Sequence, residues 1–106
     1  AAEIIREKIL HNTYQEVPHS VAVEVLKIEE KPQKNLLEIQ AEIYVEKDSQ
    51  KKIIIGREGA MIKKIGTLAR EELEYLTGKK VFLALQVKVK EKWKEKEAFI
   101  KKIYRS

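Results

Sequence analysis

The sequence has 106 residues, a formal net charge of +5 and no cysteine, which predicts a single domain over residues 1–106 and excludes disulfides, thiolate metal sites and cysteine nucleophiles. No segment has the about 18 consecutive apolar residues of a membrane-spanning helix, and the charges at Glu3 and Arg6 are not typical of a secretory signal. We therefore expect a cytoplasmic protein, and a pI near 9.3 favours a polyanionic partner.

The charges are unevenly distributed along the chain. The net charge is −4 over residues 1–46, +4 over 47–66, −2 over 67–78 and +7 over 79–106. A run of lysines is often only a solvated surface. Two basic segments separated by an acidic one fit better with a binding face whose opposite side is neutral or acidic.

The first part of the chain predicts a helix and then a strand. Ile5 and Ile9 lie one helical turn apart within residues 4–10, which indicates a helix, and Pro18 disfavours its continuation. From Val21 the apolar period changes to two, as in a strand. One face of this strand has Val21, Val23 and Val25, and the other has Ala22, Glu24, Leu26 and Ile28.

A polar turn over residues 30–35, with Pro32, precedes a second strand over residues 37–46. Its inward residues are Leu37, Ile39, Ala41, Ile43 and Val45. Tyr44 falls on the polar face, where we expect it to be exposed. The two strands predict an antiparallel hairpin with one solvated face.

Next, Asp48 and Ser49 are candidate N-cap residues for a short helix, although the three isoleucines at 53–55 favour a strand by propensity. A longer helix starts at Ala60 and stops at Thr77–Gly78. Its apolar stripe consists of Met61, Ile62, Ile65, Leu68, Ala69, Leu73 and Leu76.

A third strand over residues 81–89 and an amphipathic helix over residues 93–104 complete the pattern. The element order is therefore α-β-β-(α)-α-β-α. We predict an α+β fold in two layers, with a three-stranded sheet covered by helices on one face.

No pattern of catalytic residues accompanies this fold. Neither a phosphate-binding G-x-x-x-x-G-K-[ST] loop nor a G-x-G-x-x-G motif is present. His11 and His19 lack the spacing of zinc ligands and are predicted to be surface residues. We therefore expect no enzyme activity, no metal and no cofactor.

The most informative segment is I-I-I-G-R-E-G-A-M-I-K-K-I-G, residues 53–66. Gly56 and Gly59 flank two polar residues, so the backbone can turn sharply and approach another backbone closely. The following helix offers unpaired N–H groups and a positive dipole end to a phosphate. A backbone clamp beside apolar side chains suits single-stranded nucleic acid.

At these residues the sequence resembles a K-homology (KH) domain of type II, whose element order α-β-β-α-α-β it matches. It is closer still to the C-terminal domain of the Era family of ribosome-assembly GTPases. The similarity includes residues 44–51, 53–56, 59–61, 63–67, 78–81, 87–90 and 96–99, and Trp93. It extends over essentially the whole chain, but the GTPase domain of that family is missing.

The resemblance implies that residues 48–55 form a helix and that the domain binds single-stranded RNA, namely the 3′ end of small-subunit ribosomal RNA during ribosome assembly. It implies a clamp and a groove formed by Ile55, Gly56, Arg57, Glu58, Gly59, Met61, Ile62, Lys63 and Lys64. We expect a monomer that contacts the small ribosomal subunit. Glu58 departs from the family pattern. A carboxylate at this position would lie beside a phosphate and repel it.

Several residues have a second interpretation. Met61 and Ile62 belong either to the RNA groove or to the core, and Gly66 serves close packing or RNA contact. Trp93 is either a structural anchor or a stacking platform, and the lysines at 88, 90, 92 and 94 either protect a strand edge or follow an RNA strand. A KH-fold module that docks on a ribosomal protein or a GTPase partner is the alternative function.

Overall fold

The computed structural model describes residues 1–13 and 21–90. Their elements, in chain order, are α1 (Ala2–Thr13), β1 (Val21–Lys31), the 3₁₀ turn η1 (Pro32–Lys34), β2 (Leu36–Val45), α2 (Asp48–Ile55), the 3₁₀ turn η2 (Arg57–Gly59), α3 (Ala60–Thr77) and β3 (Lys80–Val89). The predicted helix over residues 93–104, Pro18, His19 and Trp93 lie outside the described residues. His11 is exposed, as predicted.

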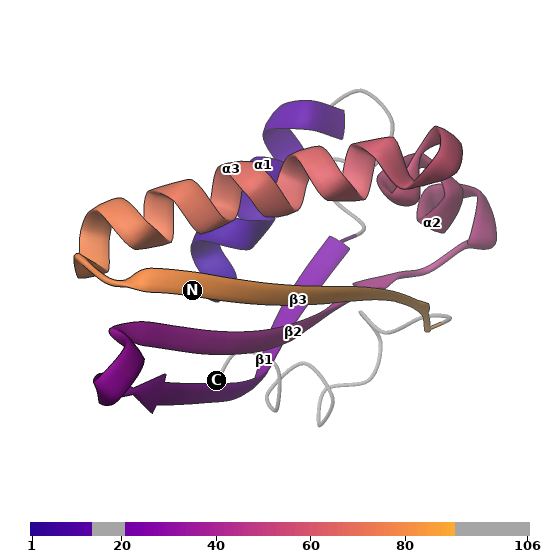
Figure 1. The fold of residues 1–106 in the computed structure, drawn as a ribbon. Coiled ribbons are helices and arrows are strands. Elements are labelled where there is room, and N and C mark those ends of the chain that lie inside the picture. The colour runs from indigo at the N-terminus through magenta and orange to yellow at the C-terminus, as the bar shows by residue number, and fades with distance from the viewer. Residues whose placement is uncertain (14–20, 91–106) are drawn as a thin grey trace.

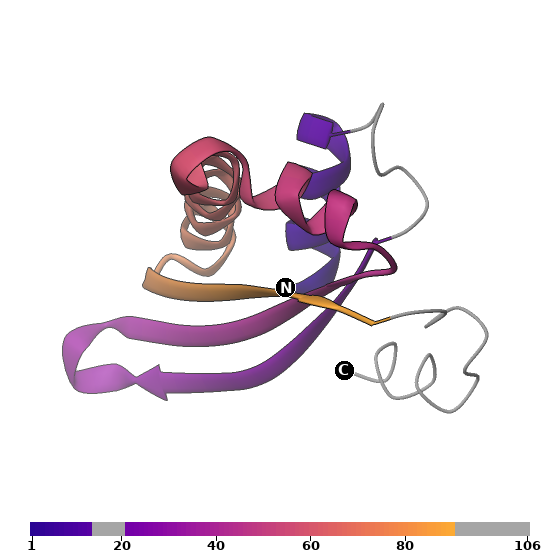
Figure 2. The same cartoon turned by 90° about the vertical axis from the view of Figure 1, so that its right-hand side faces the viewer.

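The strands form one mixed sheet in the order β1-β2-β3. β1 and β2 pair antiparallel, as the hairpin prediction requires, and β2 pairs with β3 in parallel. Figures 1 and 2 show α1, α2 and α3 together on one face of this sheet. The predicted two-layer α+β architecture is confirmed.

The core lies between the sheet and the helices. Ile5 and Ile9 of α1, Ile54 of α2 and Ile65 of α3 are completely buried against Ile43 of β2. Ile39, Ala41, Ile43 and Val45 are buried and Leu37 is half-buried, so the predicted inward face of β2 is confirmed. Alternation identified this face because it has one polar and one apolar side.

α2 is helical, which confirms the implied helix over the strand propensity of its isoleucines. Its N-cap is Lys47, one residue before the predicted Asp48 and Ser49. The Gln50 side chain fixes this start, because its Oε1 accepts hydrogen bonds from the backbone N–H groups of Glu46 (3.1 Å) and Lys47 (3.0 Å). A glutamine at the third helical position is a recognised capping residue.

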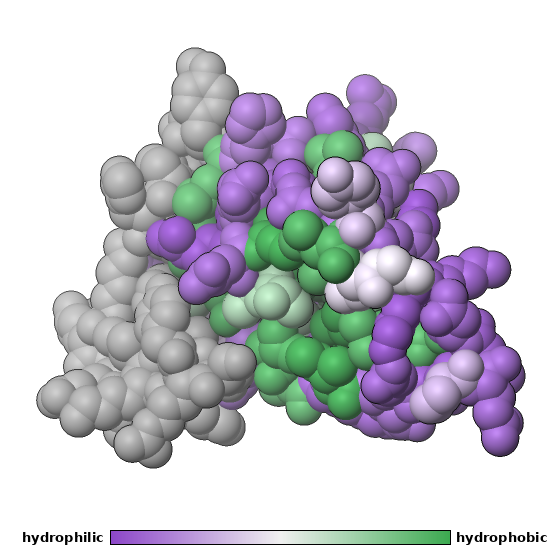
Figure 3. All heavy atoms as spheres, turned by 90° about the vertical axis from the view of Figure 1, so that its left-hand side faces the viewer, coloured by the Kyte–Doolittle hydropathy of each residue, from purple (hydrophilic) through white to green (hydrophobic). Residues whose placement is uncertain are grey.

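The predicted face of Ile28 is wrong. The β1–β2 register shifts between Val25 and Lys27, so that Ile28 pairs with Ile39 and faces the helices. The extra residue, Leu26, forms a β-bulge, which reverses the alternation beyond it. Ile28 is nevertheless 58% exposed, and Figure 3 shows apolar side chains on the surface at this end of the molecule.

The predicted exposure of Tyr44 is also wrong. Tyr44 lies on the face of the sheet opposite to α1, α2 and α3 but is only 7% exposed, and its hydroxyl donates a 2.9 Å hydrogen bond to Oε1 of Glu24. Burial, together with this carboxylate, raises the pKa of Tyr44 well above its usual value. Strand alternation predicts the face of a residue but not what covers it.

α3 ends as predicted at Gly78, which is in the left-handed conformation (φ +71°). Leu76, expected in its apolar stripe, is instead 62% exposed. The last turn is fixed to β3 by Glu74, whose Oε2 accepts a 2.9 Å hydrogen bond from the N–H of Val81. This hydrogen bond and nearby Arg70 lower the pKa of Glu74.

Candidate nucleic-acid interface

The candidate site is the loop between α2 and α3. Gly56 ends α2, with its N–H donating to the carbonyl of Lys52 at 2.8 Å, and the N–H of Gly59 donates to the carbonyl of Gly56 at 3.2 Å. The loop is therefore a tight turn, and α3 begins directly after it. The first N–H groups of a helix have no partner within the helix, so this end of α3 is suited to an anion.

The two glycines of the loop meet different surroundings. Gly56 has φ +76° and ψ 178°, a conformation that is essentially restricted to glycine. A Cβ on Gly56 would lie 2.6 Å from the Cβ and 2.8 Å from the backbone N of Met61. Gly56 therefore permits close packing of the loop against α3.

Gly59 is also left-handed (φ +78°), but a Cβ placed there would have no described atom within 4 Å. The backbone at Gly59 faces open space. This is the position at which another chain can approach the loop most closely.

Glu58 lies between these positions with φ +55°, which is unusual for a residue other than glycine. Its side chain is exposed, and within residues 1–13 and 21–90 it takes part in no ion pair. Arg57 beside it is exposed as well. Neither polar side chain of the loop is held by an ion pair with a described residue.

Four basic side chains near the loop have no carboxylate partner among the described residues, whereas Lys52 is paired with Asp48 at 3.4 Å. Lys51, Arg57, Lys63 and Lys64 form no ion pair with any described residue, and the last three are exposed. Away from the loop, by contrast, Lys8 contacts Glu72 at 2.6 Å. Lys88 contacts Glu42 at 3.2 Å, so this strand lysine has a carboxylate partner. The positive charge at the loop is available to an external anion.

The apolar residues predicted for the groove are Ile55, Met61 and Ile62. All three are half-buried and pack against the core cluster. Each therefore supports the fold with part of its side chain and leaves another part at the surface beside the loop.

Gly66 lies further along α3, where this helix passes over β3. A Cβ on Gly66 would be 3.7 Å from Cδ1 of Leu85, an ordinary van der Waals distance. Close packing therefore does not require glycine here, in contrast to Gly56.

Within the described ranges, no three potential metal-ligating side chains cluster together. No described helix is both long and apolar enough to span a membrane.

The helix–glycine loop–helix on a mixed three-stranded sheet defines a class of nucleic-acid-binding domain. Residues 16–94 match the sequence profile of the KH domain, so the chain belongs to the KH-domain family.

Among proteins of this family, the chain resembles the bacterial GTPase Era. It is 66% identical over 100 residues to GTPase Era of Thermotoga maritima, a match that covers 94% of this chain and 33% of that protein. Era of Caldanaerobacter subterraneus is 52% identical over 102 residues. The chain therefore spans about a third of the length of the curated relatives it matches.

Solved structures give the same result. A crystal structure of Aquifex aeolicus Era bound to GDP and AlF4⁻ matches with a TM-score of 0.90 and 41% identity, covering 96% of this chain and 34% of that one. A structure of Era in complex with MgGDPNP and nucleotides 1506–1542 of 16S ribosomal RNA matches equally well. The expected type II order, with the sheet covered by helices on one face, is confirmed.

All nine predicted site residues, 55–59 and 61–64, are brought together at the α2–α3 junction. The sequence did not distinguish Gly56, which packs against Met61, from Gly59, which faces open space, because this difference depends on distances in the folded chain. Nor did it reveal the groove at the opposite end of β3, described below. Its only signal was an aromatic residue, Phe82, on the outward face of the predicted strand and two positions after Lys80.

Proposed function

We propose that residues 1–106 act as one KH domain that binds single-stranded RNA through the Gly56–Gly59 loop, and that this RNA is the 3′ end of small-subunit ribosomal RNA during ribosome assembly. The domain acts as a cytoplasmic monomer and catalyses no reaction itself. The complex of a related Era with nucleotides 1506–1542 of 16S ribosomal RNA supports this choice of RNA.

One observation carries the proposal: the open backbone at Gly59 lies among cations without partners. A phosphate that approaches Gly59 meets no Cβ and gains from the positive end of α3. Arg57, Lys63 and Lys64 add long-range attraction without having to break an ion pair first.

The bases would lie against the exposed parts of Ile55, Met61 and Ile62, beside the clamped backbone. KH domains hold about four nucleotides in this way. Apolar contact with bases and electrostatic contact with phosphates then occur on the two sides of one short strand.

The test is equilibrium binding of a fluorescently labelled single-stranded RNA, copied from the 3′ end of small-subunit ribosomal RNA, as a function of salt. Each phosphate contact contributes a slope of about −0.7 to log K against log salt. Lys63→Ala and Lys64→Ala are each expected to reduce the slope by about that amount. The matched control is Lys88→Ala, because Lys88 is already paired with Glu42. Binding that is absent, or independent of salt, would contradict the proposal.

Docking on a ribosomal protein or a GTPase partner is a second candidate function. It is favoured by the exposed apolar residues Leu26, Ile28 and Leu76 and by the apolar side chains that Figure 3 shows on the surface at one end of the molecule. Apolar docking depends little on salt compared with phosphate binding. The same titration therefore separates the two candidates.

A further inference from the structure

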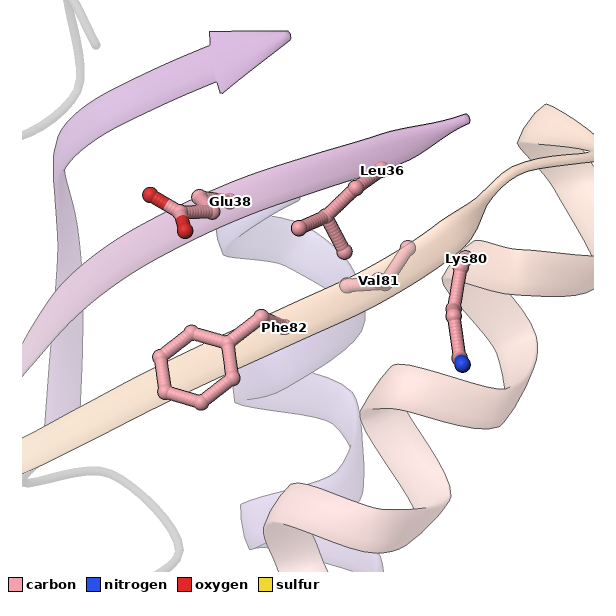
Figure 4. A pocket seen from close by; sticks show the side chains of 5 residues that line it. All are labelled: Leu36, Glu38, Lys80, Val81 and Phe82. Carbon is pink, nitrogen blue, oxygen red and sulfur yellow. The ribbon is translucent and has the colours of Figure 1, made fainter. Parts of the chain in front are cut away.

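An aromatic ring is exposed at the end of β3 that lies far from the glycine loop. Phe82 is 59% exposed, and it pairs with Glu38 on the face of the sheet opposite to α1, α2 and α3. A shallow groove of about 290 Å³ beside it is lined by Leu36, Glu38, Lys80, Val81 and Phe82 (Figure 4). The groove offers a flat apolar surface to a ligand.

The charge beside this ring is positive. Glu38 is neutralised by Lys31 at 3.3 Å, whereas Lys80 forms no ion pair with a described residue. In Figure 4 the Lys80 ammonium points away from β2. Lys34, also without an ion pair among the described residues, is close by, because the N–H of Lys80 donates to the carbonyl of Asn35 at 3.0 Å.

A nucleotide matches both properties, since it combines a planar base with a phosphate. An apolar peptide would cover the ring but leave both lysines without an anion. Aromatic side chains next to basic residues are the usual platform for single-stranded nucleic acid.

The ring lies at the end of β3 that is far from the loop, on the face of the sheet turned away from α3. Because β3 is an edge strand of the described sheet, one RNA strand can reach both places by passing over this edge. α3 starts at Gly59 and runs beside β3 toward the start of that strand (Figure 1). Its 18 residues measure about 27 Å at about 1.5 Å per residue. At about 3.4 Å per nucleotide, the rise of one strand in a stacked duplex and the shortest spacing of an extended strand, about eight nucleotides are enough to span this distance.

We propose that Phe82 and Lys80 form a second contact for the RNA strand held at the loop, with one base stacked on Phe82 and a phosphate beside Lys80. The strand runs along α3 and passes over the β3 edge of the described sheet to reach Phe82. This inference rests on the proposed function, and it adds an RNA-length dependence that the loop alone does not produce.

The experiment compares a labelled RNA of about four nucleotides, the length held by the clamp, with one extended by about eight nucleotides in either direction. Both are copied from the 3′ end of small-subunit ribosomal RNA. The full chain is expected to bind one extended RNA about 5- to 150-fold more tightly than the short one. Phe82→Ala is expected to abolish this gain, and Phe82→Tyr to retain it.

Tyr75→Ala is the matched control. Tyr75 is 86% exposed and lies on the opposite side of α3 from Gly66, since nine residues correspond to about two and a half helical turns. It is expected to leave both affinities unchanged. Lys80→Ala is expected to reduce the salt slope of the extended RNA alone, by about 0.7.

The outcomes separate the two proposals. If no RNA of either length binds to the wild-type chain, the proposed function fails. If the short RNA binds but Phe82→Ala keeps the full gain from extension, the second contact is overturned. An equal loss of affinity for the short and the extended RNA in Phe82→Ala would also overturn it, because the effect would then arise at the loop or in the fold. Thermal unfolding of the variant would show whether the fold is affected.

Discussion

Gly56→Ala and Gly59→Ala are expected to separate the structural role of the glycine loop from its binding role. At Gly56, a Cβ would lie 2.6 Å from the Cβ and 2.8 Å from the backbone N of Met61. Neither atom is the far end of a flexible side chain, so α3 or the loop must shift. Overpacking of this kind costs about 1–3 kcal/mol, and the glycine-only backbone conformation costs about 1–3 kcal/mol more.

The expected loss of unfolding free energy for Gly56→Ala is therefore about 2–6 kcal/mol. That is a large part of the about 5–15 kcal/mol typical of a domain. Gly59→Ala meets no neighbouring atom within 4 Å and costs only the left-handed conformation, about 1–2 kcal/mol. One kcal/mol corresponds to about 4–8 °C in Tm for a domain of this size.

Circular dichroism during urea and thermal unfolding measures the stability of both variants, and fluorescence anisotropy measures RNA affinity where each is folded. We expect Gly59→Ala to keep the fold and weaken RNA binding, and Gly56→Ala to lose mainly stability. Equal destabilisation, or unchanged RNA affinity in folded Gly59→Ala, would refute the assignment of roles. A double aspartate substitution of both glycines is a poorer test, because Gly56 alone disturbs the packing.

Three further changes test the loop and its supports. Glu58→Lys removes a repulsion and adds an attraction of about 1 kcal/mol each, so RNA affinity at low salt should rise by up to about 30-fold. Glu58→Gln should give about half of this change in binding free energy. Weaker binding of RNA by Glu58→Lys would mean that the carboxylate contacts a base. Gly66→Ala should raise the free energy of unfolding by about 1 kcal/mol, because its Cβ makes only an ordinary 3.7 Å contact with Leu85. A lower free energy of unfolding in a urea titration would show that the added methyl group does not fit beside Leu85. The folded-state pKa of Glu74 lies below its usual value of 4.5, so its contribution to stability is present above pH 4.5 and is lost as the pH falls through the lower folded-state pKa. Urea midpoints measured across this range should therefore depend less on pH in Glu74→Gln than in the wild type.

The sheet could be predicted because its strands have one apolar and one polar face. In β2, Ile39 and Ile43 alternate with Glu38 and Glu42, and only one register buries the isoleucines. The bulge in β1 could not be predicted, since Leu26 is as apolar as the preceding Val25 and no glycine marks the insertion. A single extra residue then reversed the face of everything beyond it.

Residues 53–55 show a different limit. Three isoleucines favour a strand by propensity, but they form the last turn of α2, where Ile54 is completely buried against the core. Tertiary packing outweighs a propensity difference that spans only about 1 kcal/mol. Tyr44 was misassigned for a related reason, because its burial and its hydrogen bond to Glu24 depend on neighbours far apart in the sequence.

The location of the candidate site was predictable, but the different roles of its two glycines were not. Gly56 and Gly59 have almost the same φ, +76° and +78°, and a sequence presents them as equivalent halves of one motif. Their difference arises because α3 turns back over Gly56 and brings Met61 against it, while Gly59 remains on the outer side of the turn. A loop held rigid at one glycine keeps the other glycine open at a fixed place, and that fixed opening is what allows a flexible phosphate chain to bind without first ordering the protein.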